Sequence, residues 1–264
     1  MAEHDRNPWR RFLALPNESR TKTVLVAFLV SAICAVLVSG ATVALRPIQA
    51  ANRAAEEQAR IEALVQGIPG MATLLEEAGG SLSTVVVDLA AGHAATDVTP
   101  ATLNAALNDP ANWTALEPGQ DLAGLGQRPD IAQVFLLRKD GRVSFVLLPV
   151  SGQGYGGRID AIIALREDMN TIAGIAITNQ SETPGLGGRI EESAWQASFP
   201  GTELRDASGE LRFRVAHGPA TGIHEVDGIT GATRTGRGVT QMVRFWLGPN
   251  GYGPFLDAIL REEF

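Results

Sequence analysis

Residues 134–150 give the clearest strand signal in this 264-residue chain: Val134-Phe-Leu-Leu-Arg-Lys-Asp-Gly-Arg-Val-Ser-Phe-Val-Leu-Leu-Pro-Val150. Two apolar runs, Val134–Leu137 and Val143–Val150, flank the polar tetrapeptide Lys139-Asp-Gly-Arg142. Asp-Gly between two such runs is a strong signal for the tight turn of a β-hairpin. The sequence therefore predicts two antiparallel strands joined by a turn at residues 139–142.

A second strand pair is predicted directly after this hairpin. Ile159–Leu165 and Ile172–Thr178 are apolar runs joined through Glu167-Asp-Met-Asn170. Shorter extended runs are Thr84–Leu89 and Leu211–Val215, and the latter alternates with arginines as a half-exposed strand does. Further helices are predicted at residues 190–199, 239–247 and 255–261. Largely antiparallel strands with helices around them indicate an α+β domain, and the chain shows no repeat and no Rossmann or P-loop pattern.

The N-terminal part predicts a single membrane span. Residues 1–22 form a polar, basic tail, and Val24–Leu45 then runs without a charge. That run is long enough to cross a hydrocarbon core as a helix, and longer than the apolar part of a signal peptide. Because the basic flank precedes the span, the positive-inside rule puts the N-terminus in the cytoplasm. The rest of the chain then lies on the far side, in the periplasm of a Gram-negative cell.

These patterns divide the chain into four parts. We predict a cytoplasmic tail at 1–22, a transmembrane helix at 23–45, a helical stalk at 46–70 and an α+β domain at 71–264. Pro47 suits the first turn of the stalk helix, since proline is tolerated where its missing N–H would have no partner. Met71–Glu77 is a further short helix, and residues 91–129 indicate loops and short helices.

Composition excludes several classes of function. A net charge of −7 and a pI near 5.2 argue against nucleic-acid binding as the main role. The single cysteine, Cys34, lies in the most apolar part of the chain and has no partner for an intrachain disulfide. The histidines are scattered without ligand spacing, so no metal site is predicted. Nothing resembles a nucleophile–histidine–acid constellation or a carboxylate pair, so no acid–base chemistry is predicted either.

A glycine-punctuated polar loop carries the candidate site: Asp227-Gly-Ile-Thr-Gly-Ala-Thr233-Arg-Thr-Gly236. It precedes the apolar-periodic run Val239–Leu247. A threonine at the N-terminus of a helix, with backbone N–H groups and arginines close by, fits a phosphate site. The plainer interpretation is a loop that feeds a Thr/Gly helix N-cap, and such loops are common. These residues by themselves favour the cap.

Three motifs in order resemble those of one known family. The signature Asp-x-x-(Ser/Thr)-Gly-Ala-Thr, on which bacterial flavin transferases esterify FMN, is matched at Asp227, Thr230, Gly231, Ala232 and Thr233. Upstream, Glu182-Thr-Pro-Gly-Leu-Gly-Gly188 resembles the flavin-cradling loop of the same proteins, and Phe245-Trp-Leu-Gly with Gly251-Tyr-Gly-Pro-Phe-Leu256 resembles their C-terminal ending. The chain thus resembles the C subunit of the sodium-translocating NADH:quinone oxidoreductase (Nqr), from about Pro149 to its end and in its anchor.

The resemblance implies FMN held through its phosphate as an ester of Thr233. A separate flavin transferase, acting with FAD and a divalent metal, would recognise Asp227, Thr230, Gly231 and Ala232. The flavin ring would contact the loop through Glu182, Thr183, Gly185, Leu186, Gly187 and Gly188, although Glu182 is alternatively a plain solvated charge. Tyr155 either stacks on the flavin or packs at a strand start, and Arg234 or Arg237 is a candidate partner for the phosphate. A second copy of the tetrapeptide, Ser39-Gly-Ala-Thr42, has Val36 in place of the aspartate and lies in the predicted span, so it is rejected.

The function implied by the resemblance is electron transfer. In that family the C subunit relays electrons through its flavin within a six-subunit complex of the bacterial inner membrane, which couples NADH oxidation by quinone to sodium export. The chain alone would then catalyse nothing. One alternative is the G subunit of the related Rnf complex, which shares the anchor, the glycine loop and the covalent flavin. Another is a membrane-anchored flavin-binding sensor or assembly protein.

Overall fold

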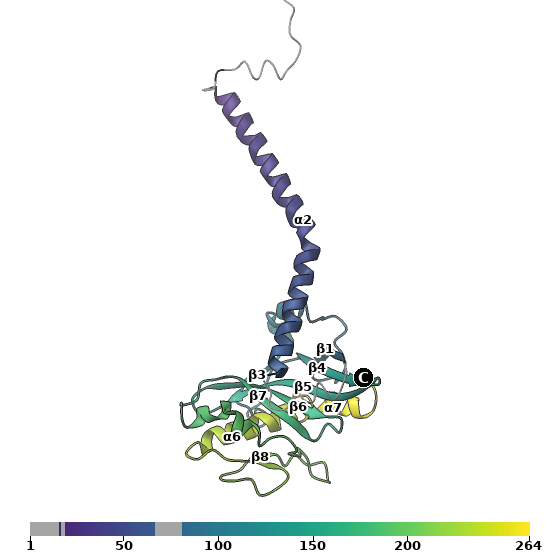
Figure 1. Cartoon of the computed structure of the whole chain (residues 1–264), viewed down its shortest axis with the longest axis vertical. Helices are drawn as coiled ribbons and strands as arrows, with labels where there is room; N and C mark the ends of the chain where they lie inside the picture. Colours follow the sequence, from purple (N-terminus) through teal and green to yellow (C-terminus); the bar gives the residue numbers. More distant parts are fainter. Residues whose placement is uncertain (1–15, 17–18, 67–80) are drawn as a thin grey trace, which may run out of the picture. The chain divides into compact units, whose positions relative to one another are not determined.

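The computed structural model describes residues 16, 19–66 and 81–264 of the chain (Figure 1). The chain splits into two compact units, Met1–Glu62 and Ala63–Phe264. Most of the predicted tail and the predicted helix Met71–Glu77 lie outside the described residues. The predicted limits of the tail, span, stalk and domain therefore stay predictions.

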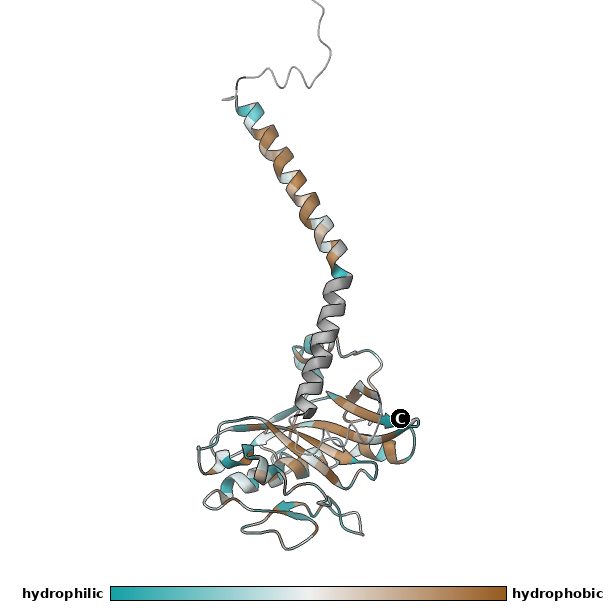
Figure 2. Ribbon diagram, viewed as in Figure 1, coloured by the Kyte–Doolittle hydropathy of each residue, from teal (hydrophilic) through white to brown (hydrophobic). Residues whose placement is uncertain are grey.

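One long helix, α2 (Arg20–Gln66), contains the predicted span. Its segment Lys22–Val43 is long and apolar enough to cross a membrane, and Figure 2 shows the hydrophobic colouring of this part of the helix. Its side chains are not buried against protein. The helix continues through position 47, so the prediction that Pro47 begins a new helix was wrong. A proline removes one hydrogen bond and crowds one carbonyl, which disturbs a helix locally without ending it when the flanking residues favour helix. Thr42 lies inside this helix and donates its hydroxyl hydrogen bond to the carbonyl oxygen of Val38 at 2.7 Å.

The second unit is built on a five-stranded antiparallel sheet. The order is β1-β4-β5-β6-β7, with the strands at Ser81–Asp88, Ile131–Lys139, Arg142–Gln153, Arg158–Arg166 and Ile172–Gln180. Both predicted strand pairs are confirmed, as is the run at 84–89. At the first hairpin, Asp140 and Gly141 have φ angles of 52° and 81°. Two successive positive φ angles match the right-handed twist of the flanking strands, which is why Asp-Gly predicts this turn.

Helices cover this sheet and close the core. α6 (Thr233–Trp246) packs against β5, and α7 (Gly253–Leu260) follows it. Two hydrogen bonds from buried aromatic side chains hold the C-terminal end of α6 and the loop after it against β5. Trp246 Nε1 donates to the Ser151 carbonyl at 2.6 Å, and the Tyr252 hydroxyl donates to the Pro149 carbonyl at 2.7 Å. The side chains with the least exposure include five aromatic rings, those of Phe199, Phe213, Phe245, Phe255 and Tyr252. The fold is therefore the predicted α+β class, a mostly antiparallel sheet with flanking helices.

The remaining elements are short. They are α4 (Leu103–Leu107), η1 (Pro110–Asn112), the hairpin β2–β3 (Trp113–Ala115 and Gln127–Pro129), η2 (Gly187–Glu191), α5 (Ser193–Gln196), and the parallel pair β8–β9 (Arg214–Val215 and Glu225–Val226). The predicted helix at 190–199 is thus two short helical turns, η2 and α5. Of the predicted strand Leu211–Val215 only the last two residues form a strand. Leu211 pairs instead in an isolated bridge with Arg205.

The start of α6 was predicted six residues too late. The helix begins at Thr233 and includes two glycines, Gly236 and Gly238. Each glycine inside a helix is less favourable than alanine by about 1 kcal/mol, so the sequence alone argues against a helix here. Packing explains their presence. A Cβ on Gly238 would lie 2.7 Å from the carbonyl oxygen of Gln153, so only glycine lets the helix approach β5 this closely.

Candidate functional site

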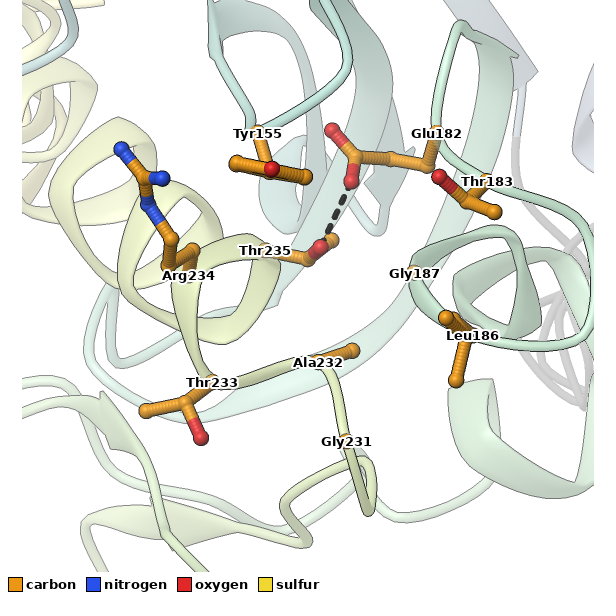
Figure 3. A pocket seen from close by; sticks show the side chains of 10 residues that line it. All are labelled: Tyr155, Glu182, Thr183, Leu186, Gly187, Gly231, Ala232, Thr233, Arg234 and Thr235. Atoms are coloured by element: carbon orange, nitrogen blue, oxygen red, sulfur yellow. Dashed lines mark hydrogen bonds between the residues drawn. The ribbon is translucent and has the colours of Figure 1, made fainter.

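A pocket with a volume of about 350 Å³ lies where three segments meet (Figure 3). The first is the glycine turn between β5 and β6, which contributes Tyr155. The second is the loop after β7, and the third is the first turn of α6 with the residues before it. The lining residues are Tyr155, Glu182, Thr183, Leu186, Gly187, Gly231, Ala232, Thr233, Arg234 and Thr235.

The N-terminus of α6 forms one side of this pocket. Ala232 is the N-cap and offers no side-chain hydrogen bond, and Thr233 is the first helical residue. Gly236 makes the first helical hydrogen bond, its N–H donating to the Ala232 carbonyl at 3.0 Å. The backbone N–H groups of residues 233–235 have no partner among the residues that the structure describes. Such N–H groups, together with the positive end of the helix dipole, favour an anion.

The three hydroxyls of the loop differ in their surroundings. Thr235 is 2% exposed and donates its hydroxyl hydrogen bond to Glu182 Oε2 at 2.6 Å. Thr233 is exposed and lines the pocket, whereas Thr230 is exposed but does not line it. In Figure 3 the hydroxyl of Thr233 lies at the edge of the pocket, away from the Glu182–Thr235 pair. Of the three hydroxyls of this loop, that of Thr233 is therefore the one that is both exposed and part of the pocket lining.

Glu182 is a buried group, and the alternative of a plain solvated charge was wrong. Its side chain is 5% exposed, and its Oε1 accepts a hydrogen bond from the N–H of Gly156 at 2.9 Å. Its own N–H donates to Oε1 of Gln180. The pairing of Glu182 with Thr235 joins residues that lie 53 positions apart, and no local pattern in the sequence indicated it.

Tyr155 and Arg234 both line the pocket, and their side chains lie next to each other (Figure 3). The guanidinium carbon of Arg234 is 4.5 Å from the centroid of the Tyr155 ring, a cation–π arrangement. The ring is 57% exposed, so it is not buried by packing at the start of the strand, which was one of its two predicted roles. Arg234 lines the pocket, whereas the other arginine proposed for the phosphate, Arg237, does not.

Asp227 lies outside the pocket lining, on the exposed loop that leads to α6. Its Oδ1 accepts a hydrogen bond from the N–H of Ala220 at 2.7 Å, and its carbonyl oxygen accepts one from Trp195 Nε1 at 2.8 Å. The carboxylate therefore has a local structural contact as well as an exposed surface.

Glu225 lies in β9, the short strand before this loop, and its carboxylate accepts several hydrogen bonds. The N–H of Thr221, the guanidinium of Arg214 and the hydroxyl of Thr221 all donate to its carboxylate, and they lower the pKa of Glu225 to about 2. The carboxylate thus stays charged at neutral pH and holds the loop before Asp227 in place.

Two glycines of the predicted site occupy turns that need glycine. Gly185 and Gly231 have φ angles of 75° and 79°, a left-handed conformation that other residues rarely adopt. Neighbouring Gly188 donates its N–H to the Thr183 carbonyl at 2.9 Å, which closes the loop on itself. Gly185 and Gly188 therefore shape the loop without lining the pocket.

Comparison with known proteins identifies the family of the chain. The FMN-binding domain family model matches residues 154–248, a range that contains every residue of the pocket. The chain is 37% identical over 256 residues to the C subunit of Na(+)-translocating NADH-quinone reductase from Pseudomonas aeruginosa, covering 93% of this chain and 98% of the relative. The chain belongs to this family of C subunits.

Other members of the family agree with this assignment. The protein of the same name from Yersinia pestis is 37% identical over 252 residues, covering 92% of this chain and 94% of the relative. The crystal structure of Shewanella oneidensis NqrC superposes with a TM-score of 0.63 at 28% identity, over 72% of this chain and 88% of that one. The resemblance drawn from the three sequence motifs is therefore confirmed.

The predicted site residues fall into two groups. Eight of them line the one pocket: Tyr155, Glu182, Thr183, Leu186, Gly187, Gly231, Ala232 and Thr233. Four lie beside it: Gly185, Gly188, Asp227 and Thr230. The pocket has two further lining residues: Arg234, which was predicted only as a candidate partner for the phosphate, and Thr235, to which no role was assigned. Within the described part of the chain, no cluster of three or more His, Cys, Asp or Glu side chains is arranged to hold a metal ion.

Proposed function

We propose that this chain carries FMN as a phosphoester of Thr233 and relays electrons within a sodium-translocating NADH:quinone reductase. The observation that carries the proposal is the position of Thr233, an exposed hydroxyl in the first turn of α6 on the wall of a pocket. FMN would supply the electron-accepting group. The chain itself supplies the anchoring oxygen, the anion site and the walls of the pocket.

The phosphate fits the start of α6. A phosphodiester keeps one negative charge. The N–H groups of residues 233–235, which have no partner among the described residues, point toward the N-terminal end of the helix, where the dipole favours an anion. The interaction of one anion with a helix N-terminus stabilises by about 0.3–1 kcal/mol at an exposed site. Arg234 is at the same opening and adds a positive charge.

The ring system fits the opposite wall. Gly187 lines the pocket without a side chain, because a Cβ there would meet Glu182 and Thr235, so a flat ligand would meet loop backbone at this point. Leu186 and Tyr155 are large side chains that remain 47% and 57% exposed at the pocket, which leaves them free to cover an apolar ring. The exposed hydroxyl of Thr183 adds a polar contact on this side.

Attachment would need a second protein. A threonine hydroxyl is a weak nucleophile at neutral pH, and no base contacts that of Thr233 within the described residues. With FAD as donor, the Thr233 oxygen would form a bond to the phosphorus of the FMN half. AMP would leave with the electrons of the broken P–O bond, and the hydroxyl proton would pass to the flavin transferase or to water. The exposed residues Asp227 and Thr230 would then form part of the surface that the transferase reads.

The membrane arrangement follows from α2 and the basic tail before it. We infer a single-pass subunit of the bacterial inner membrane, with a cytoplasmic N-terminus and a periplasmic flavin domain. The partners would be the other five subunits of the complex. A flavin fixed to an anchored domain cannot dissociate, which suits a carrier that passes electrons between fixed partners.

The relay is tested by Thr233→Val in the assembled complex. The variant should insert and assemble, while sodium-stimulated quinone reduction by NADH collapses. NADH oxidation by an artificial acceptor at the upstream subunit should survive, because electrons still enter and then stop. Thr230→Ser, at the neighbouring hydroxyl of the motif, is the matched control and should retain both activities. Normal quinone reduction by a fully assembled, flavin-free Thr233→Val complex would overturn the relay and favour a sensor or assembly protein.

A further inference from the structure

Glu182 stands at the junction of the three segments that form the pocket. Its Oε1 accepts from the Gly156 N–H at 2.9 Å, and its Oε2 accepts from the Thr235 hydroxyl at 2.6 Å (Figure 3). Gly156 belongs to the turn between β5 and β6, and Thr235 belongs to the first turn of α6. Glu182 itself follows β7. One carboxylate therefore ties together segments that come from three separate parts of the chain.

Glycines surround this carboxylate at distances that other residues would not allow. A Cβ on Gly154 would lie 2.1 Å from Oε1 of Glu182, and a Cβ on Gly187 would lie 2.4 Å from its Oε2. The backbone of both loops thus closes on the carboxylate from two sides. Because a buried polar group is costly unless its oxygens are hydrogen-bonded, the observed orientation is strongly favoured over others.

Within the described residues no ion pair contacts this carboxylate, and the positive charge of Arg234 lies elsewhere on the pocket lining. Glu182 takes part in none of the ion pairs found in the described part of the chain, so no arginine or lysine nitrogen there lies within 4.0 Å of it. A negative charge on the wall of a pocket opposes the arrival of an electron in that pocket. Since Glu182 itself is only 5% exposed, solvent screens its charge less than a charge at the protein surface.

We propose that Glu182 is a positioning residue with an electrostatic role. Through Thr235 it holds the helix turn that begins at Thr233 against the two loops, and its charge keeps the midpoint potential of the group in the pocket low. The second half rests on the proposed function, whereas the first half does not. The two halves therefore need separate measurements.

Positioning is tested without flavin, by urea unfolding of the full chain in detergent. Glu182→Ala and Thr235→Val remove the same hydrogen bond, so the double variant should lose much less than the sum of the single losses. Thr235→Ser keeps the hydroxyl and should unfold at nearly the wild-type midpoint. Thr240→Val is the control on the same helix, because its hydroxyl bonds to the Gly236 carbonyl at 2.9 Å and not to Glu182. Its loss should add to that of Glu182→Ala. Simple additivity of Glu182→Ala and Thr235→Val would overturn the positioning role.

The charge is tested with Glu182→Gln in the flavin-loaded chain. Glutamine keeps an oxygen for the Gly156 N–H, and the Thr235 hydroxyl can rotate to accept from the amide, so the wall stays in place without its charge. The one-electron equilibrium should shift toward the reduced flavin by roughly tenfold, a rise of about 59 mV in midpoint potential. Thr240→Val should leave the potential unchanged.

The outcomes separate the two proposals. A loaded Glu182→Gln chain with the wild-type potential would overturn the electrostatic role alone. A wild-type chain that takes up no flavin would overturn the proposed function, and with it the electrostatic half of this inference. The unfolding measurements would still decide the positioning role.

Discussion

Gly187→Ala should destabilise the folded domain, because the added methyl group would overlap with two buried side chains of the pocket. The added Cβ would lie 2.4 Å from Glu182 Oε2 and 2.5 Å from Thr235 Oγ1, both well inside van der Waals contact. Neither atom can simply move away, because the two groups are buried and hydrogen-bonded to each other. Overpacking of this kind costs about 1–3 kcal/mol. For a domain of this size each kcal/mol lowers the melting temperature by about 2–4 °C, so the expected drop is about 2–12 °C.

The assay is urea and thermal unfolding of the full chain, with flavin content measured by absorbance per protein. Two other glycines provide controls. Gly119→Ala has open space around its Cβ and no left-handed φ, so it should change stability by less than about 0.5 kcal/mol. Gly185→Ala also has open space but a φ of +75°, so it should cost about 1–2 kcal/mol through backbone strain alone. A Gly187→Ala chain with wild-type stability and full flavin content would refute the reasoning.

Three further predictions use other parts of the chain. Asp227→Asn keeps an oxygen for the Ala220 N–H, so it should fold normally and still load less flavin if the transferase reads the charge; full loading would show that it does not. An alkaline phosphatase fused to the C-terminus should be active and an equivalent Sec-exported green fluorescent protein dark, and the reverse pair would put the domain in the cytoplasm. Burial raises the pKa of the Tyr252 hydroxyl far above its usual range. Because an unfolded tyrosine releases its proton near pH 10 and the folded one does not, stability should fall as the pH rises above about 10. Ultraviolet absorbance should then show Tyr252 ionising only together with unfolding, and ionisation before unfolding would contradict its burial.

The strands could be predicted because their signals are local. The turn at Asp140 and Gly141 needs two positive φ angles, and the sequence has the residues that adopt them. The apolar runs on both sides have the length and composition of buried strands, and the structure pairs them as expected. The long apolar helix could be predicted equally well, since a charge-free apolar run of this length is typical of a membrane-spanning helix.

The start of α6 and the contacts of Glu182 could not be predicted in the same way. Gly236 and Gly238 lower local helix propensity, and the close approach to β5 that requires Gly238 is a tertiary fact. Glu182 and Thr235 are far apart in sequence, and each belongs to a residue type that is usually exposed on a loop. The motif indicated this loop because it is a short linear signature, which can be read from the sequence without knowledge of the fold. The buried hydrogen-bonded pair of Glu182 and Thr235 has no such linear signature.

The central claim is that Thr233, and no other residue, carries the flavin. The direct measurement is the intact mass of the full chain expressed with a flavin transferase, followed by peptide mapping. The wild-type chain should gain the mass of one FMN less one water, on the peptide that contains Thr233, and Thr233→Val should have the unmodified mass. An unmodified wild-type chain would contradict the claim. So would a flavin mapped to Thr230 or Thr42, or one retained by Thr233→Val.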